Sequence, residues 1–100
     1  MPDAYQTRLY QNCYNAENEI EATQRFARWA TLELPFQPFV GLMLTLEGGG
    51  WAKLASVSWD VANANFECGC HREFLPYGFE AEHEISEETG WSVSNIIVLE

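Results

Sequence analysis

The chain has 100 residues, of which 47% are hydrophobic and 14% aromatic, and its 15 acidic against five basic side chains give a formal net charge of −10. This length and apolar content predict one folded domain over residues 1–100 and exclude the composition of a disordered chain. No apolar run reaches the about 18 residues that a membrane-spanning helix needs. The few basic residues argue against direct nucleic-acid binding, which requires a basic stripe to replace counterions on phosphate.

The beginning of the chain and its cysteines both bear on the compartment. Residues 1–8 lack the basic start and the apolar stretch of a secretory signal. The chain has three cysteines, an odd number that makes poor material for a disulfide framework. We therefore predict a cytoplasmic protein.

The first segment, residues 4–14, is rich in tyrosine, and we predict a strand there. A helix is the alternative, because Tyr5, Leu9 and Cys13 recur every four residues. The segment is short enough to fit either period.

The next segment, residues 16–32, predicts an amphipathic helix. Asn15 is a favourable N-cap, and acidic residues follow in the first turn, where the helix dipole favours them. Pro35 places the end of the helix shortly before it. The stripe at helical spacing consists of Ala16, Ile20, Thr23, Phe26, Ala27, Trp29 and Ala30.

Strands and turns are predicted for most of the remaining chain. Residues 39–46 are apolar at successive positions, which indicates a central strand covered on both faces. The glycines of residues 47–50 predict a hairpin turn into a partner strand at residues 51–59. Residues 60–65 predict another turn, in which Asp60 bonds to its own backbone.

The last third of the chain contains three further predicted strands. Residues 66–74 alternate between apolar and polar side chains, and Pro76 and Gly78 end that pattern. Residues 79–86 also alternate, although their glutamates and alanine favour a short helix as the alternative. Residues 91–99 are β-branched and apolar enough to close the sheet. The predicted fold class is therefore α+β, with one amphipathic helix packed on an antiparallel sheet of five or six strands.

The cysteines are the first candidates for a chemical role. A zinc site can be assembled on paper from Cys13, Cys68, Cys70 and His71. One residue separates Cys68 from Cys70, whereas zinc motifs use a gap of two or more. In a regular strand His71 would point to the opposite face, so two thiols in the core are the simpler interpretation and we expect no metal or other cofactor.

No catalytic residue can be assigned from the sequence. A nucleophilic cysteine needs nearby positive charge to lower its pKa, and the surroundings here are acidic. Carboxylates are plentiful, but none stands out as one of a catalytic pair. The triple glycine at 48–50 lacks the lysine of a phosphate-binding loop. We therefore expect a protein that is not an enzyme.

The acidic surface is the strongest candidate for function. On a strand over residues 79–86, alternate glutamates would form a row at about 7 Å spacing, which resembles a phosphate backbone. A charge that only keeps an exposed strand soluble is the alternative. The predicted interaction residues are Glu80, Glu82, Glu84, Glu87 and Glu88.

Three functional hypotheses follow. The first is an acidic protein–protein interaction module, an inhibitor or modulator of a basic nucleic-acid-handling partner, with a profile typical of accessory proteins of phages and other mobile elements. The surplus of aromatic residues also predicts a homodimer. The second is a small-ligand binder or enzyme, and the third is a Cys/His metal-binding protein. The ligand pocket of the second hypothesis would lie between helix and sheet and be lined by Phe26, Trp29, Met43, Trp51 and Trp59.

Overall fold

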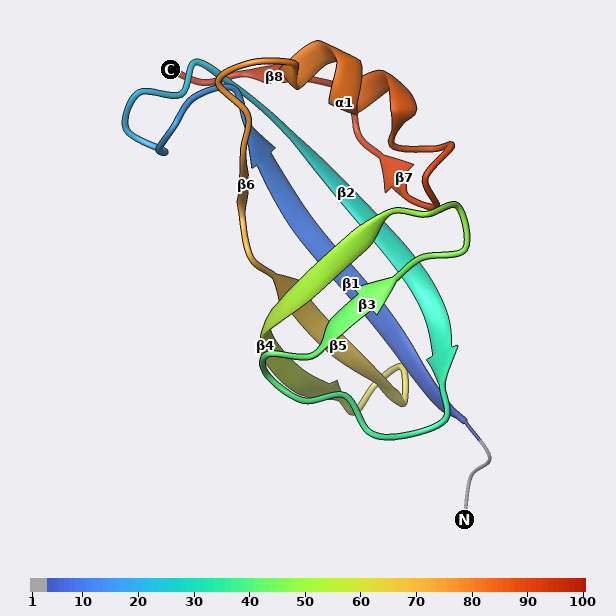
Figure 1. The fold of residues 1–100 in the computed structure, drawn as a ribbon. Coiled ribbons are helices and arrows are strands. Elements are labelled where there is room, and N and C mark those ends of the chain that lie inside the picture. The colour runs from blue at the N-terminus through green and yellow to red at the C-terminus, as the bar shows by residue number, and fades with distance from the viewer. Residues whose placement is uncertain (1–3) are drawn as a thin grey trace.

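The structure, a computed structural model, describes residues 4–100 and is mostly β (Figure 1). Eight strands form one mixed sheet, and the described residues contain one helix of seven residues. The elements in chain order are β1 (Tyr5–Tyr14), β2 (Gln24–Leu34), β3 (Met43–Thr45), β4 (Trp51–Asp60), β5 (Asn65–Cys70), β6 (Glu73–Phe74), α1 (Phe79–Ile85), β7 (Ser92–Val93) and β8 (Ile97–Val98). The strand order is β3-β4-β5-β1-β2-β7, with β6 beside β1 and β8 beside β2.

The predicted α+β fold is wrong, because the segment expected to be the main helix is strand β2. It pairs with β1 in antiparallel register from Tyr5↔Leu34 to Tyr14↔Arg25, so the predicted strand at the start of the chain is confirmed. Phe26 and Ala30 share a face at helical spacing, but they also share a face of a strand. The pattern therefore fitted both periods. Ile20, expected in the helical stripe, lies in the hairpin loop and is 96% exposed.

The sheet is mixed because β1 pairs with β5 in parallel, with Thr7 opposite Phe66. The expectation of a purely antiparallel sheet is thus corrected. The sheet bends strongly, and β3 and β4 cross in front of β1 and β2 in Figure 1. Buried residues of both layers meet there, since Leu54 of β4 belongs to the same core cluster as Leu9 of β1 and Ala30 of β2. The bend therefore lets the sheet cover itself, which is the role that the predicted helix would have had.

The predicted central strand at residues 39–46 is also wrong. Only Met43–Thr45 forms a strand, and β3 lies at the end of the strand order, with Met43 exposed. Gly41 adopts a positive φ of 91° in a turn just before it, which an extended chain cannot contain.

Strand β4 confirms the predicted partner strand of the hairpin, but its burial does not follow one alternation along the whole strand. Ala52 and Leu54 are fully buried, whereas Trp51 and Lys53 are exposed. The register with β5 shifts between Leu54 and Ser56, which indicates a bulge. Past the bulge the alternation changes phase, and this is why one continuous period of two did not describe the strand.

The predicted strand at residues 79–86 is instead α1. Its face toward the sheet consists of Phe79, Glu82 and Ser86, at the three- and four-residue steps of a helix. The helix propensity of glutamate and alanine therefore prevailed over the apparent alternation. After α1, β7 and β8 pair with β2, so the continuous strand predicted for residues 91–99 is only partly confirmed, as two separate strands of two residues each.

The buried side chains form two clusters along the β1–β2 hairpin. One contains Leu9 and Ala30, which are cross-strand partners, and the other contains Cys13 and Phe26, also partners. The pair between them in the register is Gln11↔Arg28. A polar pair thus divides the apolar interior.

Two turns contact each other beside this polar pair, the β3–β4 turn and the turn after α1. A Cβ on Gly48 would lie 2.3 Å from the Glu88 carbonyl oxygen, whereas a Cβ on Gly49, where φ is +94°, would meet nothing within 4 Å. We expect Gly48→Ala to lower the free energy of unfolding by about 3 kcal/mol, because backbone atoms would have to separate. Gly49→Ala should lower the free energy of unfolding by only about 1 kcal/mol, because alanine at this position would have to adopt the left-handed backbone conformation. Urea unfolding of the two variants checks this order, and equal losses would contradict it.

Candidate ligand pocket at Arg28

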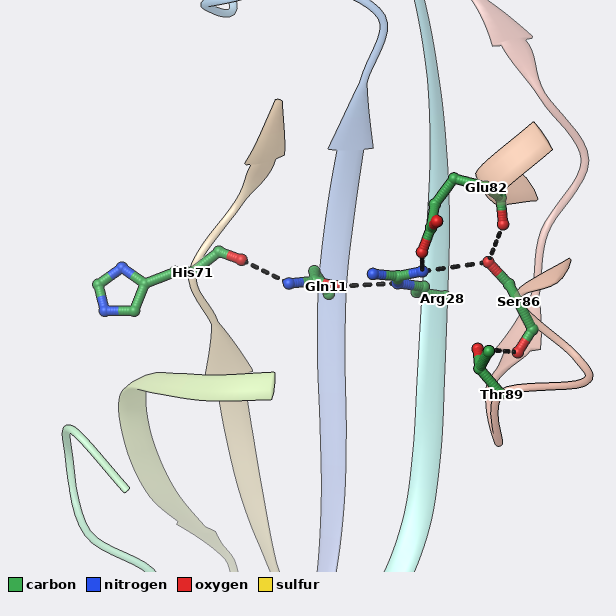
Figure 2. A network of polar contacts seen from close by, with 6 residues as sticks. All are labelled: Gln11, Arg28, His71, Glu82, Ser86 and Thr89. Carbon is green, nitrogen blue, oxygen red and sulfur yellow. Dashed lines mark hydrogen bonds and ion pairs between the residues drawn. The ribbon is translucent and has the colours of Figure 1, made fainter. Parts of the chain in front are cut away.

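Arg28 is a buried cation held from several sides (Figure 2). Its side chain points from β2 to the inner face of the sheet and is 5% exposed. Nε donates to Gln11 Oε1 at 2.8 Å, and Nη1 donates to Glu82 Oε1 at 2.9 Å and to Ser86 Oγ at 3.1 Å. The guanidinium carbon also lies 4.8 Å from the centre of the Trp91 ring. The charge is therefore compensated by one carboxylate and one aromatic ring.

The network extends beyond Arg28 in both directions. Gln11 Nε2 donates to the His71 carbonyl at 2.8 Å. Ser86 Oγ donates to the Glu82 carbonyl at 2.7 Å, and Thr89 Oγ1 donates to the Ser86 carbonyl at 3.0 Å. The contacts thus join β1, β2, α1 and two connecting segments, as Figure 2 shows. Such a network fixes the rotamers of its members and makes the surrounding site rigid.

A pocket of about 260 Å³ opens on this network. Its walls come from the β3–β4 turn, β6, α1 and the turn after α1. The charged groups of the lining are one guanidinium and two carboxylates, so the formal charge of the pocket is −1. The lining residues are Arg28, Gly49, Gly50, Trp51, Glu73, Glu82, Thr89 and Trp91. We call this the Arg28 pocket.

No family model, no curated protein and no solved structure matches the chain. Within residues 4–100, no helix is long and apolar enough to cross a membrane.

The predicted interaction residues separate into two groups. Glu80, Glu84, Glu87 and Glu88 are exposed, and their three- and four-residue spacing places them on one side of α1 and the helical turn that follows it. Glu82 points the opposite way, to Arg28. The row predicted for a strand therefore does not exist. The acidic face, as we call the four exposed residues, has helical spacing instead.

The predicted apolar pocket between helix and sheet does not form, because the helix that would have closed it is a strand. Phe26 lies in the second core cluster, against Phe79 and His83. Trp29 is half-buried on β2. The three remaining predicted residues, Met43, Trp51 and Trp59, are exposed.

Two of those exposed residues line separate hollows. Trp51 lines the Arg28 pocket. Trp59 lines an aromatic groove of about 440 Å³ with Tyr5 and Phe66.

The cysteines and His71 are not brought together. Cys13 lies in the second core cluster, whereas Cys68 and Cys70 lie in the first. His71 is exposed. Residues 4–100 contain no group of three or more His, Cys, Asp or Glu side chains placed to hold a metal ion. All three thiols are free and buried.

Asp60 occupies the turn that was predicted for it. Its carboxylate accepts from the Asn63 side chain at 2.7 Å and from the backbone N–H groups of Ala62 and Asn63. These hydrogen bonds, that from the Asn63 side chain foremost, lower the pKa of Asp60.

Burial raises the pKa of the Cys13 thiol from 9.0 to about 12, against a smaller lowering by Arg28. Burial likewise raises the pKa of Cys68 and of Cys70 to about 11. A pKa that is raised in the folded state contributes stability below pH 9, which is lost as the pH rises toward 11 or 12. We expect the free energy of unfolding to fall between pH 8 and pH 11 by about 2 kcal/mol more in the native sequence than in Cys13→Ala. Urea unfolding at both pH values measures this difference. An equal fall in the free energy of unfolding in the native sequence and in Cys13→Ala would contradict a raised pKa of Cys13.

The sequence interpretation missed Gln11, Arg28, Ser86 and Trp91 as parts of a site. A signal for one of them existed. On a strand over residues 24–34, Arg28 falls between Phe26 and Ala30 on the inward face, where an unpaired charge is costly. Such an arginine requires a buried partner. The helical interpretation hid this signal, because it allowed a basic side chain at this position to lie outside the apolar stripe.

Proposed function

We propose that the protein is an acidic protein–protein interaction module that binds a basic partner through the acidic face of α1. The observation that carries the proposal is the uncompensated charge of that face. Glu80, Glu84, Glu87 and Glu88 are all exposed, and within residues 4–100 none of them forms an ion pair. Like charges at three- and four-residue spacing destabilise a helix. A basic partner would relieve that repulsion.

The placement of the basic residues supports the same proposal. Arg28 is buried against Glu82, Arg72 pairs with Glu19, and Arg25 donates to Asn12. The guanidinium of Arg8 lies over the Tyr10 ring. Lys53, on β4, is exposed. Most of the basic side chains thus have partners other than the acidic face. The negative field of the acidic face is therefore directed toward solvent, which favours fast association with a cation-rich surface.

The proposed partner class is still a basic protein that handles nucleic acid, since a surface that binds phosphate also attracts a cluster of carboxylates. The accessory proteins of phages and other mobile elements stay the suggested context, on composition alone. The proposal places the protein in the cytoplasm, which the three free thiols support because disulfides are rare there.

The test is a pull-down from lysate with the native sequence and two charge variants, washed at low and then at high salt. The face variant carries Gln in place of Glu80, Glu84, Glu87 and Glu88. A control variant of equal net charge carries Gln in place of Glu17, Glu21, Glu33 and Glu100, which are also exposed and form no ion pair within residues 4–100. We expect a basic protein to be retained at low salt by the native sequence and the control but lost from the face variant, because screening and loss of charge act on the same contact.

Two outcomes would contradict the proposal. In one, the captured proteins are all neutral or acidic and their binding does not depend on salt. In the other, both variants lose the basic partner equally, which would show that net charge rather than the acidic face is responsible.

We propose a homodimer as a second feature, supported by large exposed side chains on neighbouring strands. Met43 of β3 and Trp59 of β4 are both more than half exposed. Aromatic and methionine side chains are enriched at interfaces. Light scattering coupled to gel filtration measures the mass, and a monomer of 11.4 kDa at all concentrations would exclude the dimer.

A further inference from the structure

The Arg28 pocket contains hydrogen-bonding groups that the protein itself does not use. Within residues 4–100, Arg28 Nη2 and the Trp91 indole N–H donate no hydrogen bond, and the Glu73 carboxylate accepts none. Trp91 is only 3% exposed as a whole, but its unpaired indole N–H is not fully buried, since Asn65 Oδ1 is the one completely buried side-chain polar atom without a partner in residues 4–100. These unpaired groups therefore remain open to hydrogen bonds from a ligand in the pocket.

The shape of the pocket leaves these groups accessible. A Cβ on Gly50 would lie 3.0 Å from Trp91 Nε1 and 2.6 Å from the Thr89 carbonyl oxygen. Any side chain at this position would therefore crowd the indole N–H, and glycine keeps it uncovered. At the rim, Trp51 is 56% exposed and offers an indole ring that no ring of the described chain stacks on.

The charge pattern excludes simple ions as the best ligand. An anion would satisfy Arg28 and Trp91 but would meet the two carboxylates, Glu73 and Glu82. A cation would satisfy Glu73 but would meet the guanidinium and leave the indole donor unpaired. The lining therefore favours a ligand that carries hydrogen-bond donors and acceptors together and no negative charge.

An apolar ligand fits no better. It would cover Glu73 and the unpaired donors without giving them hydrogen bonds. The free-energy cost of desolvating these groups exceeds the gain from burying the apolar ligand. The volume of about 260 Å³ lies just below the usual range of drug-sized pockets, about 300–1,000 Å³, and suits a single small ring.

We propose that the Arg28 pocket binds a neutral saccharide ring. Sugar hydroxyls are donors and acceptors at once, so neighbouring hydroxyls can accept from Arg28 Nη2 and Trp91 Nε1 and donate to Glu73 and Glu82. The apolar C–H face of the ring packs on the indole of Trp51. Because Arg28 is already oriented by Gln11, Glu82 and Ser86, little side-chain ordering is needed on binding. This function goes beyond the acidic face and does not depend on it.

The experiment is a titration of the ¹⁵N-labelled protein with the methyl glycosides of glucose, galactose, mannose and N-acetylglucosamine, one at a time at millimolar concentrations. The indole N–H signals of the four tryptophans report the site. We expect at least one glycoside to shift the signals of Trp51 and Trp91 but not that of Trp59, with a midpoint that does not change with salt. Arginine amide and inorganic phosphate are the cationic and anionic probes.

The variants give a matched comparison on one strand. Trp51→Ala and Trp59→Ala remove tryptophans of nearly equal exposure, 56% and 53%; because Trp59 also packs on Phe66, urea unfolding is measured for both variants before their binding is compared. We expect Trp51→Ala to weaken glycoside binding about 10-fold or more and Trp59→Ala to leave it unchanged. Glu73→Gln, which keeps the shape of the side chain, should weaken binding several-fold.

Three results would overturn the proposal. The first is that none of the glycosides shifts the indole signals of Trp51 and Trp91. The second is that Trp51→Ala binds a glycoside as tightly as the native sequence does. The third is that arginine amide or phosphate shifts Trp91 while the glycosides do not, which would assign the pocket to an ion. Each of these leaves the acidic face untouched, so failure here and failure of the interaction module are told apart.

Discussion

Replacing Arg28 by alanine is expected to lower the free energy of unfolding by about 3 kcal/mol. Removing one member of a buried ion pair leaves the other unpaired, and this typically costs about 3–5 kcal/mol. Here the lower end applies, because the Glu82 side chain is 30% exposed and can be partly solvated. Gln11 and Ser86 would lose their donor as well. Urea unfolding followed by tryptophan fluorescence measures the loss, which should lower Tm by about 10 °C or more.

Two further variants separate the ion pair from the volume of the side chain. Glu82→Gln keeps an acceptor for Arg28 Nη1 and should cost about 1 kcal/mol. Replacing both Arg28 and Glu82 by methionine should recover more than half of the loss seen in Arg28→Ala, because an apolar pair leaves no buried charge. If Arg28→Ala stays within 1 kcal/mol of the native sequence, the network is not structural.

The second large effect is expected at Phe26, where alanine should lower the free energy of unfolding by about 3–5 kcal/mol. Phe26 is fully buried, and its ring centre lies 5.2 Å from that of Phe79 and 4.8 Å from that of His83. These contacts attach α1 to the hairpin. The cavity left by alanine would loosen this attachment, so thermal unfolding should also begin at α1.

Ile20→Ala is the control that distinguishes β2 from the predicted helix. Ile20 and Phe26 belonged to the same apolar stripe of that helix, and both substitutions would then be costly. In the structure Ile20 is 96% exposed in the β1–β2 loop, so its replacement should change the free energy of unfolding by less than about 0.5 kcal/mol. A loss above 2 kcal/mol for Ile20→Ala would support the helix and contradict the hairpin.

The sequence predicted several elements correctly where local chemistry decides them. The β3–β4 turn follows from its run of glycines, the turn at Asp60 from carboxylate–backbone hydrogen bonds, strand β1 from its tyrosines and strand β4 from the hairpin turn before it. The exposure of Glu80, Glu84, Glu87 and Glu88 also follows from charge alone. Each of these depends on residues within a few positions of one another.

Only the tertiary structure decided the elements whose residues fit two periods. The segment around Phe26 is a strand because β1 pairs with it along its whole length, and the partner lies more than ten residues away. Residues 79–85 are a helix because Phe79, Glu82 and Ser86 meet the inner face of the sheet. The Arg28 pocket assembles residues of β2, β4, β6, α1, the β3–β4 turn and the segment after α1. Long-range strand pairing and burial select among local alternatives of nearly equal free energy. A single segment of the sequence does not specify which distant segment it will pack against, so its own pattern cannot decide between helix and strand.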